Sequence, residues 1–136
     1  MIWLLDTDTF AYLINRAPGA ERIKRRLSGR SPGEARLSAI TLSEIQYGLA
    51  RGDVALERRQ ALDELVDLFQ VEDYPAAAAR DFGEIRAALD RAGRRIGPYD
   101  LLIAAHARHL GAVLVTNNER EFRRVPGLSV QNWTKP

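Results

Sequence analysis

The chain contains no cysteine among its 136 residues. This absence excludes a disulfide framework, a thiolate zinc site and a cysteine nucleophile. The sequence also lacks any apolar run near the roughly 20 residues that span a bilayer. Its start, Met1 to Asp6, has no basic segment and reaches an acid at once, unlike a signal peptide. We therefore expect a soluble, cytoplasmic protein.

Lysine is scarce, because only Lys24 and Lys135 among the 20 basic residues are lysines. The remainder are arginines, which suit bidentate contacts with phosphate and stacking on bases. Codon bias produces the same composition, and a net charge of +2 adds only mild support for a nucleic-acid partner. The length fits one domain over residues 1–136, and 46% hydrophobic residues exclude extensive disorder.

Short apolar runs alternate with amphipathic segments along the chain. We expect strands at 2–5, 36–40, 69–71, 112–115 and 128–130. The segments between them predict helices over 7–16, 20–27, 41–52, 54–69, 75–92 and 101–110, with a short helix near Phe122. Gly93 and Gly111 are placed to end two of these helices. The alternation predicts an α/β fold, a central parallel sheet of about five short strands with helices on both faces.

Acidic side chains follow or adjoin the predicted strands. Asp6 comes directly after the first strand, Glu44 lies early in the helix after the second, and Asp100 opens the helix that leads to the strand at 112–115. Because ligands collect at the carboxyl ends of parallel strands, these groups should converge at one edge. Acids beside apolar runs are costly to ionise and repel one another. A divalent cation relieves both problems, and oxygen ligands suit Mg²⁺ or Mn²⁺.

Each acid also has a purely structural interpretation. Glu44 fits the last position of a capping box opened by Thr41, and Asp100 fits a helix N-cap. Asp6 fits the closing residue of a turn after the strand. The combination of the three is more specific than any one of them.

Four segments resemble the PIN-domain family in the right order and over nearly the whole chain. They are Leu-Leu-Asp-Thr at 4–7, Thr-Leu-Ser-Glu-Ile-Gln-Tyr-Gly at 41–48, Ile-Gly-Pro-Tyr-Asp-Leu-Leu-Ile-Ala-Ala-His-Ala at 96–107 and Val-Leu-Val-Thr-Asn-Asn-Glu-Arg-Glu-Phe at 113–122. Within this family they look most like the VapC toxins of bacterial type II toxin–antitoxin systems. The resemblance implies a PIN fold and a metal-dependent endoribonuclease.

The resemblance also implies roles for individual residues. Asp6, Glu44 and Asp100 match the three acids of the family's metal site. The fourth acid is best matched by Glu121, with Glu119 close behind. Two further positions are implied to support the site: Thr116 would hydrogen-bond the first acid, and Asn118 would position a water or ligand. Two others depart from the family pattern. Asp8 either caps the first helix or widens metal binding, and Tyr99 stands where close relatives usually carry asparagine.

The implied reaction is hydrolysis of an RNA phosphodiester, in tRNA or rRNA, by water activated on Mg²⁺ or Mn²⁺. The family also implies a VapB-like antitoxin that covers the groove, and a homodimer built with the helix that carries Tyr47 and the alanine-rich helix from Ala76. Three arginines are either guides for the RNA backbone or solvated surface charge, namely Arg94, Arg95 and Arg120.

Two other classes of function compete with this interpretation. A phosphatase of the haloacid-dehalogenase type would use Asp6 as nucleophile and Asp8 as general acid. That class needs a late lysine, whereas Lys24 comes too early and Lys135 lies in the tail. The second alternative is a catalytically inactive PIN-like module that binds RNA or protein, against which the presence of all three acids argues.

The histidines and tryptophans are expected to have structural roles. His106 and His109 lie three residues apart on a predicted helix, the spacing of a metal pair, but a zinc site needs further ligands. His106 also sits within an apolar segment, which favours a core or rim position. Trp3 and Trp133 are expected to pack in the interior rather than stack on bases.

Overall fold

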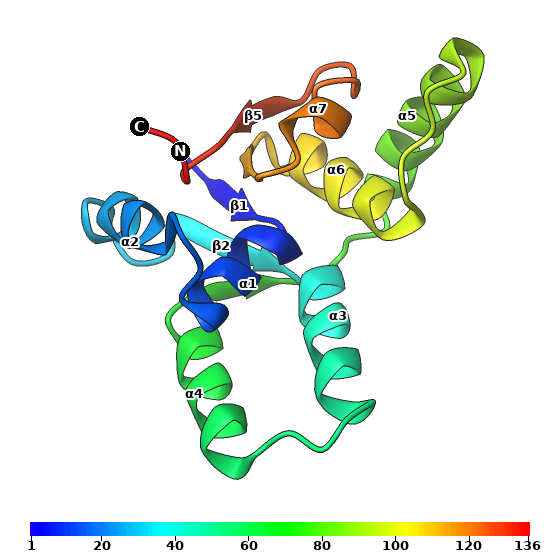
Figure 1. The fold of residues 1–136 in the computed structure, drawn as a ribbon. Coiled ribbons are helices and arrows are strands. Elements are labelled where there is room, and N and C mark those ends of the chain that lie inside the picture. Colours follow the sequence, from blue (N-terminus) through cyan, green and yellow to red (C-terminus); the bar gives the residue numbers. More distant parts are fainter.

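The computed structural model describes all 136 residues, and they form one five-stranded parallel sheet flanked by seven helices (Figure 1). The strands lie in the order β3-β2-β1-β4-β5. Their bounds are β1 Trp3–Leu5, β2 Ala35–Ser38, β3 Gln70–Glu72, β4 Val113–Val115 and β5 Ser129–Gln131. The predicted fold class is confirmed, with each strand within two residues of its expected bounds.

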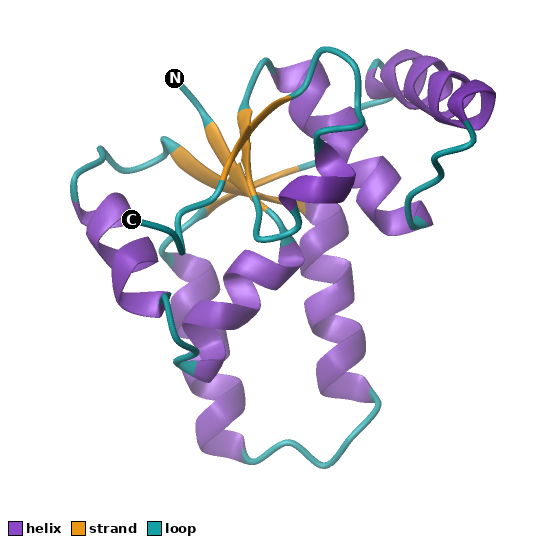
Figure 2. Ribbon diagram, turned by 45° about the horizontal axis from the view of Figure 1, so that its top comes forward, coloured by secondary structure: helices purple, strands orange, loops and turns teal.

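Helices cover both faces of the sheet (Figure 2). Their bounds are α1 Thr7–Asn15, α2 Ala20–Ser28, α3 Ala39–Ala50, α4 Leu56–Asp67, α5 Ala78–Ala92, α6 Pro98–Leu110 and α7 Glu119–Phe122. Leu4 and Leu5 show why β1 must be covered twice. Successive side chains of a strand point to opposite faces, so Leu4 enters a core with α5, α6 and α7, and Leu5 enters a core with α1, α2 and α4.

The strand order creates a crevice beside β1. The chain moves outward from β1 to β2 and β3 on one side, and to β4 and β5 on the other. Ligands bind at such a reversal of strand order, outside the carboxyl ends of the strands. Leu5 pairs in register with Leu37 and with Val115. The residues that follow these three in the chain therefore reach the same edge, and they are Asp6, Ser38 and Thr116.

The start of α3 corrects the predicted capping box. The helix begins at Ala39, and Ser38 is its N-cap, with a side-chain oxygen that accepts from the N–H of Ile40 at 3.1 Å. Thr41 lies buried within the first turn, and Glu44 is the sixth helical residue, too far along to close a box. Ser and Thr are both good N-caps. Pairing of β2 with β3 ends at Ser38, opposite Glu72, so the helix begins directly after Ser38 and this residue, rather than Thr41, becomes the N-cap.

Other helix starts also differ from the predictions. Asp6, and not Asp8, caps α1, because its carboxylate accepts from the N–H of Thr9 at 2.8 Å. Asp8 is exposed in the first turn of that helix. Asp100 is the third residue of α6 rather than its N-cap, since Pro98 supplies the first helical position.

The two predicted glycine stops are confirmed. Gly93 and Gly111 end α5 and α6 with φ of 66° and 65°. This left-handed conformation suits glycine because it has no Cβ to clash with the backbone.

The histidine and tryptophan predictions are confirmed. His106 is fully buried, with Nδ1 2.8 Å from the hydroxyl of Ser38, and burial lowers its pKa. His109 instead faces Asp81, with 3.4 Å between Nδ1 and a carboxylate oxygen. The rings of Trp3 and Trp133 pack with centroids 6.3 Å apart, and Trp133 has no exposed surface. None of the helices combines the length and apolarity needed to cross a bilayer.

Candidate active site

Asp6 directly follows β1 at the carboxyl edge of the sheet and is only 3% exposed. One carboxylate oxygen accepts from the backbone of Thr9, and the other accepts from the hydroxyl of Thr116 in a short hydrogen bond. The resemblance implied this second bond. Burial raises the pKa of Asp6 to about 6, although both hydrogen bonds act in the opposite direction. Ionised Asp6 at neutral pH therefore lacks enough positive charge around it.

Asp100 brings a second carboxylate to the same place from the first turn of α6. Its pKa is also raised to about 6, first by partial burial and then by repulsion from Asp6, Glu44, Asp8 and Glu121. Repulsion between carboxylates acts over short distances. Side chains from four separate parts of the chain thus share one electrostatic neighbourhood, as the strand-end argument predicted.

Glu44 is held at this edge by a threonine of the neighbouring helix. The Thr7 hydroxyl donates to a Glu44 oxygen at 2.6 Å, and the hydroxyls of Thr7 and Thr41 lie 3.3 Å apart. These contacts join the start of α1 to α3. This role of Thr7 and Thr41 has no signal in the sequence, because the contacting residues are separated by 34 and 37 positions and such contacts produce no periodicity.

The structure separates the two candidates for the fourth acid. The Asn118 amide donates to Glu121 at 2.9 Å, and the Asn118 N–H donates to the Thr116 hydroxyl at 2.9 Å. Glu121 is thereby connected through Asn118 and Thr116 to Asp6. The family resemblance implied Glu121 for this place, whereas the chain of hydrogen bonds has no signal in the sequence.

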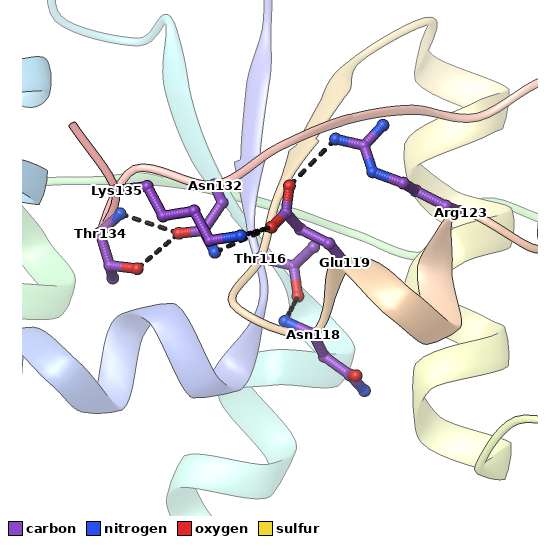
Figure 3. Close-up of polar contacts among 7 residues, drawn as sticks. All are labelled: Thr116, Asn118, Glu119, Arg123, Asn132, Thr134 and Lys135. Atoms are coloured by element: carbon purple, nitrogen blue, oxygen red, sulfur yellow. Dashed lines mark hydrogen bonds and ion pairs between the residues drawn. The ribbon is translucent and has the colours of Figure 1, made fainter.

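Glu119 turns to the C-terminal tail instead (Figure 3). Its carboxylate contacts Lys135 at 2.7 Å and Arg123 at 3.0 Å, and accepts from Asn132 at 3.3 Å. Hydrogen bonds from Lys135 and Arg123 lower the pKa of Glu119 to about 2. Glu119 is therefore already neutralised by cations of its own chain.

A hollow of about 700 Å³ adjoins the acids between α3 and α6. Thr7 and Glu44 line it together with Tyr47 and Tyr99, whose side chains are 66% and 59% exposed. Tyr99 therefore stands at the rim of the hollow rather than inside the hydrogen-bond network of the acids. Arg94, Arg95 and Arg120, which the sequence left open as RNA guides or solvated surface charge, are all exposed, and Arg95 pairs with Asp90 at 3.1 Å.

The donor set suits a hard divalent cation. No three Asp, Glu or His side chains form a compact ligand cage. Mg²⁺ does not require one, since it usually keeps several waters and binds through one or two carboxylates. Asp6 and Asp100, both with raised pKa values, offer two such oxygen ligands. The residues present therefore fit this kind of ion.

Comparison with known proteins identifies the family. The model of the PIN domain matches residues 3–128. The chain belongs to the PIN-domain family. It is 39% identical over 132 residues to the tRNA(fMet)-specific endonuclease VapC of Shigella flexneri, covering 97% of this chain and 98% of that protein. It is 37% identical over 135 residues to ribonuclease VapC2 of Rickettsia felis, covering 99% and 100%.

Solved PIN-domain structures agree with this assignment. The crystal structure of VapBC2 from Rickettsia felis bound to a DNA fragment from their promoter superposes with a TM-score of 0.88 at 35% identity, covering 98% of this chain and 99% of that one. The crystal structure of DNA-bound VapBC from Salmonella typhimurium superposes with a TM-score of 0.89 at 37% identity, covering 98% of this chain and 98% of that one. Membership of the PIN-domain family, with relatives named as ribonucleases, argues against the phosphatase alternative.

Proposed function

We propose that this PIN domain is a VapC-type endoribonuclease toxin that depends on Mg²⁺ or Mn²⁺. The observation that carries the proposal is the convergence of Asp6, Glu44, Asp100 and Glu121 on the crevice beside β1. Four carboxylates in one place repel the phosphates of RNA. A divalent cation held there turns this electrostatic repulsion into attraction, so the edge can bind a phosphodiester.

Asp6 and Asp100 would hold the ion, with Glu44 and Glu121 at its periphery. When bound, it supplies a water of lowered pKa and stabilises charge on the phosphate. The protein fixes the ligands in place: Thr9 and Thr116 orient Asp6, Thr7 orients Glu44, and Asn118 orients Glu121. In-line attack by water leaves a 5′-phosphate and a 3′-hydroxyl.

The substrate and partner follow from the relatives. A curated relative is named for tRNA(fMet), so tRNA is the first substrate to examine. The related structures are toxin–antitoxin complexes, and we propose a VapB-like antitoxin for this chain. Its peptide would occupy the hollow between α3 and α6, because Glu44 and Thr7 belong to both the hollow and the acid cluster. We propose a cytoplasmic location, since that is where the proposed tRNA substrate is found.

The test is cleavage of total tRNA and rRNA by the purified chain, free of any partner, with Mg²⁺, Mn²⁺ or EDTA. We expect cleavage at few sites, abolished by EDTA. The variants Asp6→Asn and Asp100→Asn should each lower the rate at least a hundredfold, because each removes a charged ligand of the ion. Asp53→Asn is the matched control, since Asp53 is exposed in the loop between α3 and α4.

The outcomes separate the alternatives. Cleavage that survives in both site variants would point to a contaminating nuclease and remove the site assignment. RNA binding without cleavage in any metal would favour the inactive PIN-like module.

A further inference from the structure

A second charged surface lies far from the acids in sequence, on α2 and the C-terminal tail. It is a hollow of about 420 Å³ lined by basic side chains and the C-terminal proline, with no acidic side chain among them. We call it the basic hollow. Its lining residues are Arg22, Arg25, Arg26, Arg30, Lys135 and Pro136.

The four arginines of the basic hollow have no acidic partner. Arg22 donates to the carbonyl of Thr134, and Arg30 donates to the carbonyl of Arg26. Glu21, the acid on α2, pairs with Lys24 at 3.2 Å instead. Uncompensated like charges in a concave site concentrate a positive potential and raise the local concentration of anions. Here the uncompensated charge is carried by guanidinium groups, which match phosphate in geometry.

Arg30 is fixed in place by two aromatic rings. Its guanidinium carbon lies 4.1 Å from the ring centre of Trp3 and 4.6 Å from that of Trp133. The buried Nε of Arg30 has no hydrogen-bond partner. A guanidinium held between rings loses little freedom on binding an anion.

The tail connects the basic hollow to the catalytic edge. Lys135 lines the hollow, and its ammonium contacts Glu119 of α7, two residues from Glu121 (Figure 3). Helix α2, which carries three of the hollow's arginines, packs on the opposite face of the sheet from α6 (Figure 1). A ligand that reaches both places must be long and carry negative charge along its length. It must also tolerate the metal-loaded acid site, as a phosphodiester chain does.

We propose that the basic hollow binds phosphates of the RNA substrate away from the scissile bond. This inference rests on the proposed ribonuclease function and names where the body of a folded RNA is held. An acidic protein segment is the competing occupant. RNA supplies both the phosphodiester that the catalytic edge requires and further phosphates for the hollow, whereas an acidic segment offers carboxylates alone.

The experiment compares binding of the whole chain to bulk tRNA and to a ten-nucleotide single strand, in EDTA and over a range of salt concentrations. The variant is Arg25→Gln with Arg26→Gln, because both side chains are exposed and neither donates a hydrogen bond. Loss of two phosphate contacts should reduce the slope of log affinity against log salt by roughly 1.5 for tRNA. For tRNA that change corresponds to about 30-fold weaker binding than wild type at 0.1 M salt, taking equal affinities at 1 M. The short strand, which the metal-free acids repel from the catalytic edge, should weaken as well.

The matched control is Arg86→Gln with Arg91→Gln, which removes the same charge from exposed positions of α5. A slope for tRNA equal to that of the control would overturn the proposal. So would a variant that binds tRNA normally but loses affinity for a polyglutamate peptide. Wild-type protein that binds tRNA through the hollow but cleaves nothing in Mg²⁺ or Mn²⁺ would instead refute the proposed catalysis and leave the binding surface supported.

Discussion

At the scale of single residues, Asp6 shows how the site opposes the stability of the fold. The folded-state pKa of about 6 lies above the ordinary value of 3.8, so the folded protein binds the proton more tightly than the unfolded chain does. In metal-free protein, the loss of folding stability caused by ionising Asp6 is complete above pH 6. It declines as the pH falls through 6 and disappears below about pH 4.

We expect Asp6→Asn to raise the unfolding free energy of metal-free protein at pH 7.5 by roughly 1–2 kcal/mol. The substitution removes the cost of ionising buried Asp6, which is about 3 kcal/mol at 1.4 kcal/mol per pKa unit. It also weakens the hydrogen bond to Thr116 or Thr9, which offsets about 1 kcal/mol of that gain. Thermal unfolding of both proteins in EDTA between pH 4 and 8 measures this difference in stability. Asp53→Asn serves as control, and a lower Tm for Asp6→Asn at pH 7.5 would contradict the argument.

Glu119 and Glu121 lie two residues apart and face different surroundings. Glu121→Gln should lower RNA cleavage at least tenfold, because it removes one of the charges gathered around Asp100. Glu119→Gln should cleave nearly as wild type but release the tail, seen as faster hydrogen exchange at residues 132–135. The reverse assignment of the two effects would place Glu119 in the site.

The pH dependence of Glu119 has the opposite sign to that of Asp6. Its folded-state pKa of about 2 lies below the ordinary 4.5. The stability that it contributes is present above pH 4.5 and is lost as the pH falls toward 2. Glu119→Gln and wild type should therefore converge in Tm at the acidic end of the titration.

At the scale of secondary-structure elements, the start of α3 joins folding to the site. Ser38 ends β2, caps α3 and contacts the buried ring of His106. Because α3 carries Glu44, the same hydroxyl sets the position of a site carboxylate through the helix start.

We expect Ser38→Ala to lower the unfolding free energy by about 2 kcal/mol, since it leaves the Ile40 N–H and the His106 nitrogen without partners. Ser43→Ala is the control, because Ser43 is exposed on the same helix and bonds only the carbonyl of Ala39. Chemical denaturation at pH 7 compares the two. Equal losses would show that the cap and its buried histidine contribute little.

At the scale of the whole molecule, the sheet places functions on separate faces. The acid cluster lies at the carboxyl edge, the hollow with Tyr47 adjoins it between α3 and α6, and the basic hollow lies over α2. Tyr47 is among the few large apolar side chains left exposed. Its helix is one of the two through which the resemblance implies a homodimer.

We expect the chain to sediment near 30 kDa, twice the 15.2 kDa of one copy. Tyr47→Glu should shift it toward the monomer, because a charge is costly inside an apolar interface. Leu68→Glu is the control, with a residue of similar exposure at the end of α4. Sedimentation of wild type as a monomer would contradict the dimer.

The sequence alone was informative about which strands and helices follow one another along the chain, and poor about the residue at which each helix begins. Apolar runs such as residues 2–5 and 112–115 are typical of buried strands in a parallel sheet, so the alternation of strands and helices along the chain and the fold class were readable, whereas the order of the strands within the sheet was not. Helix starts were not, because Ser38 and Thr41, or Asp6 and Asp8, are equally good caps by residue type. The choice within each pair depended on where the ladder of a neighbouring strand ended.

The sequence by itself determined the α/β fold, the acids that adjoin buried strands and the motifs that identify a PIN domain. These depend on local periodicity and residue chemistry, which every short segment carries. Only the tertiary structure decided that Glu119 faces Lys135 while Glu121 faces the acids, that Thr7 holds Glu44, and that four arginines share one hollow. Such contacts join residues far apart in the chain, and packing of the helices on the sheet is what brings them together.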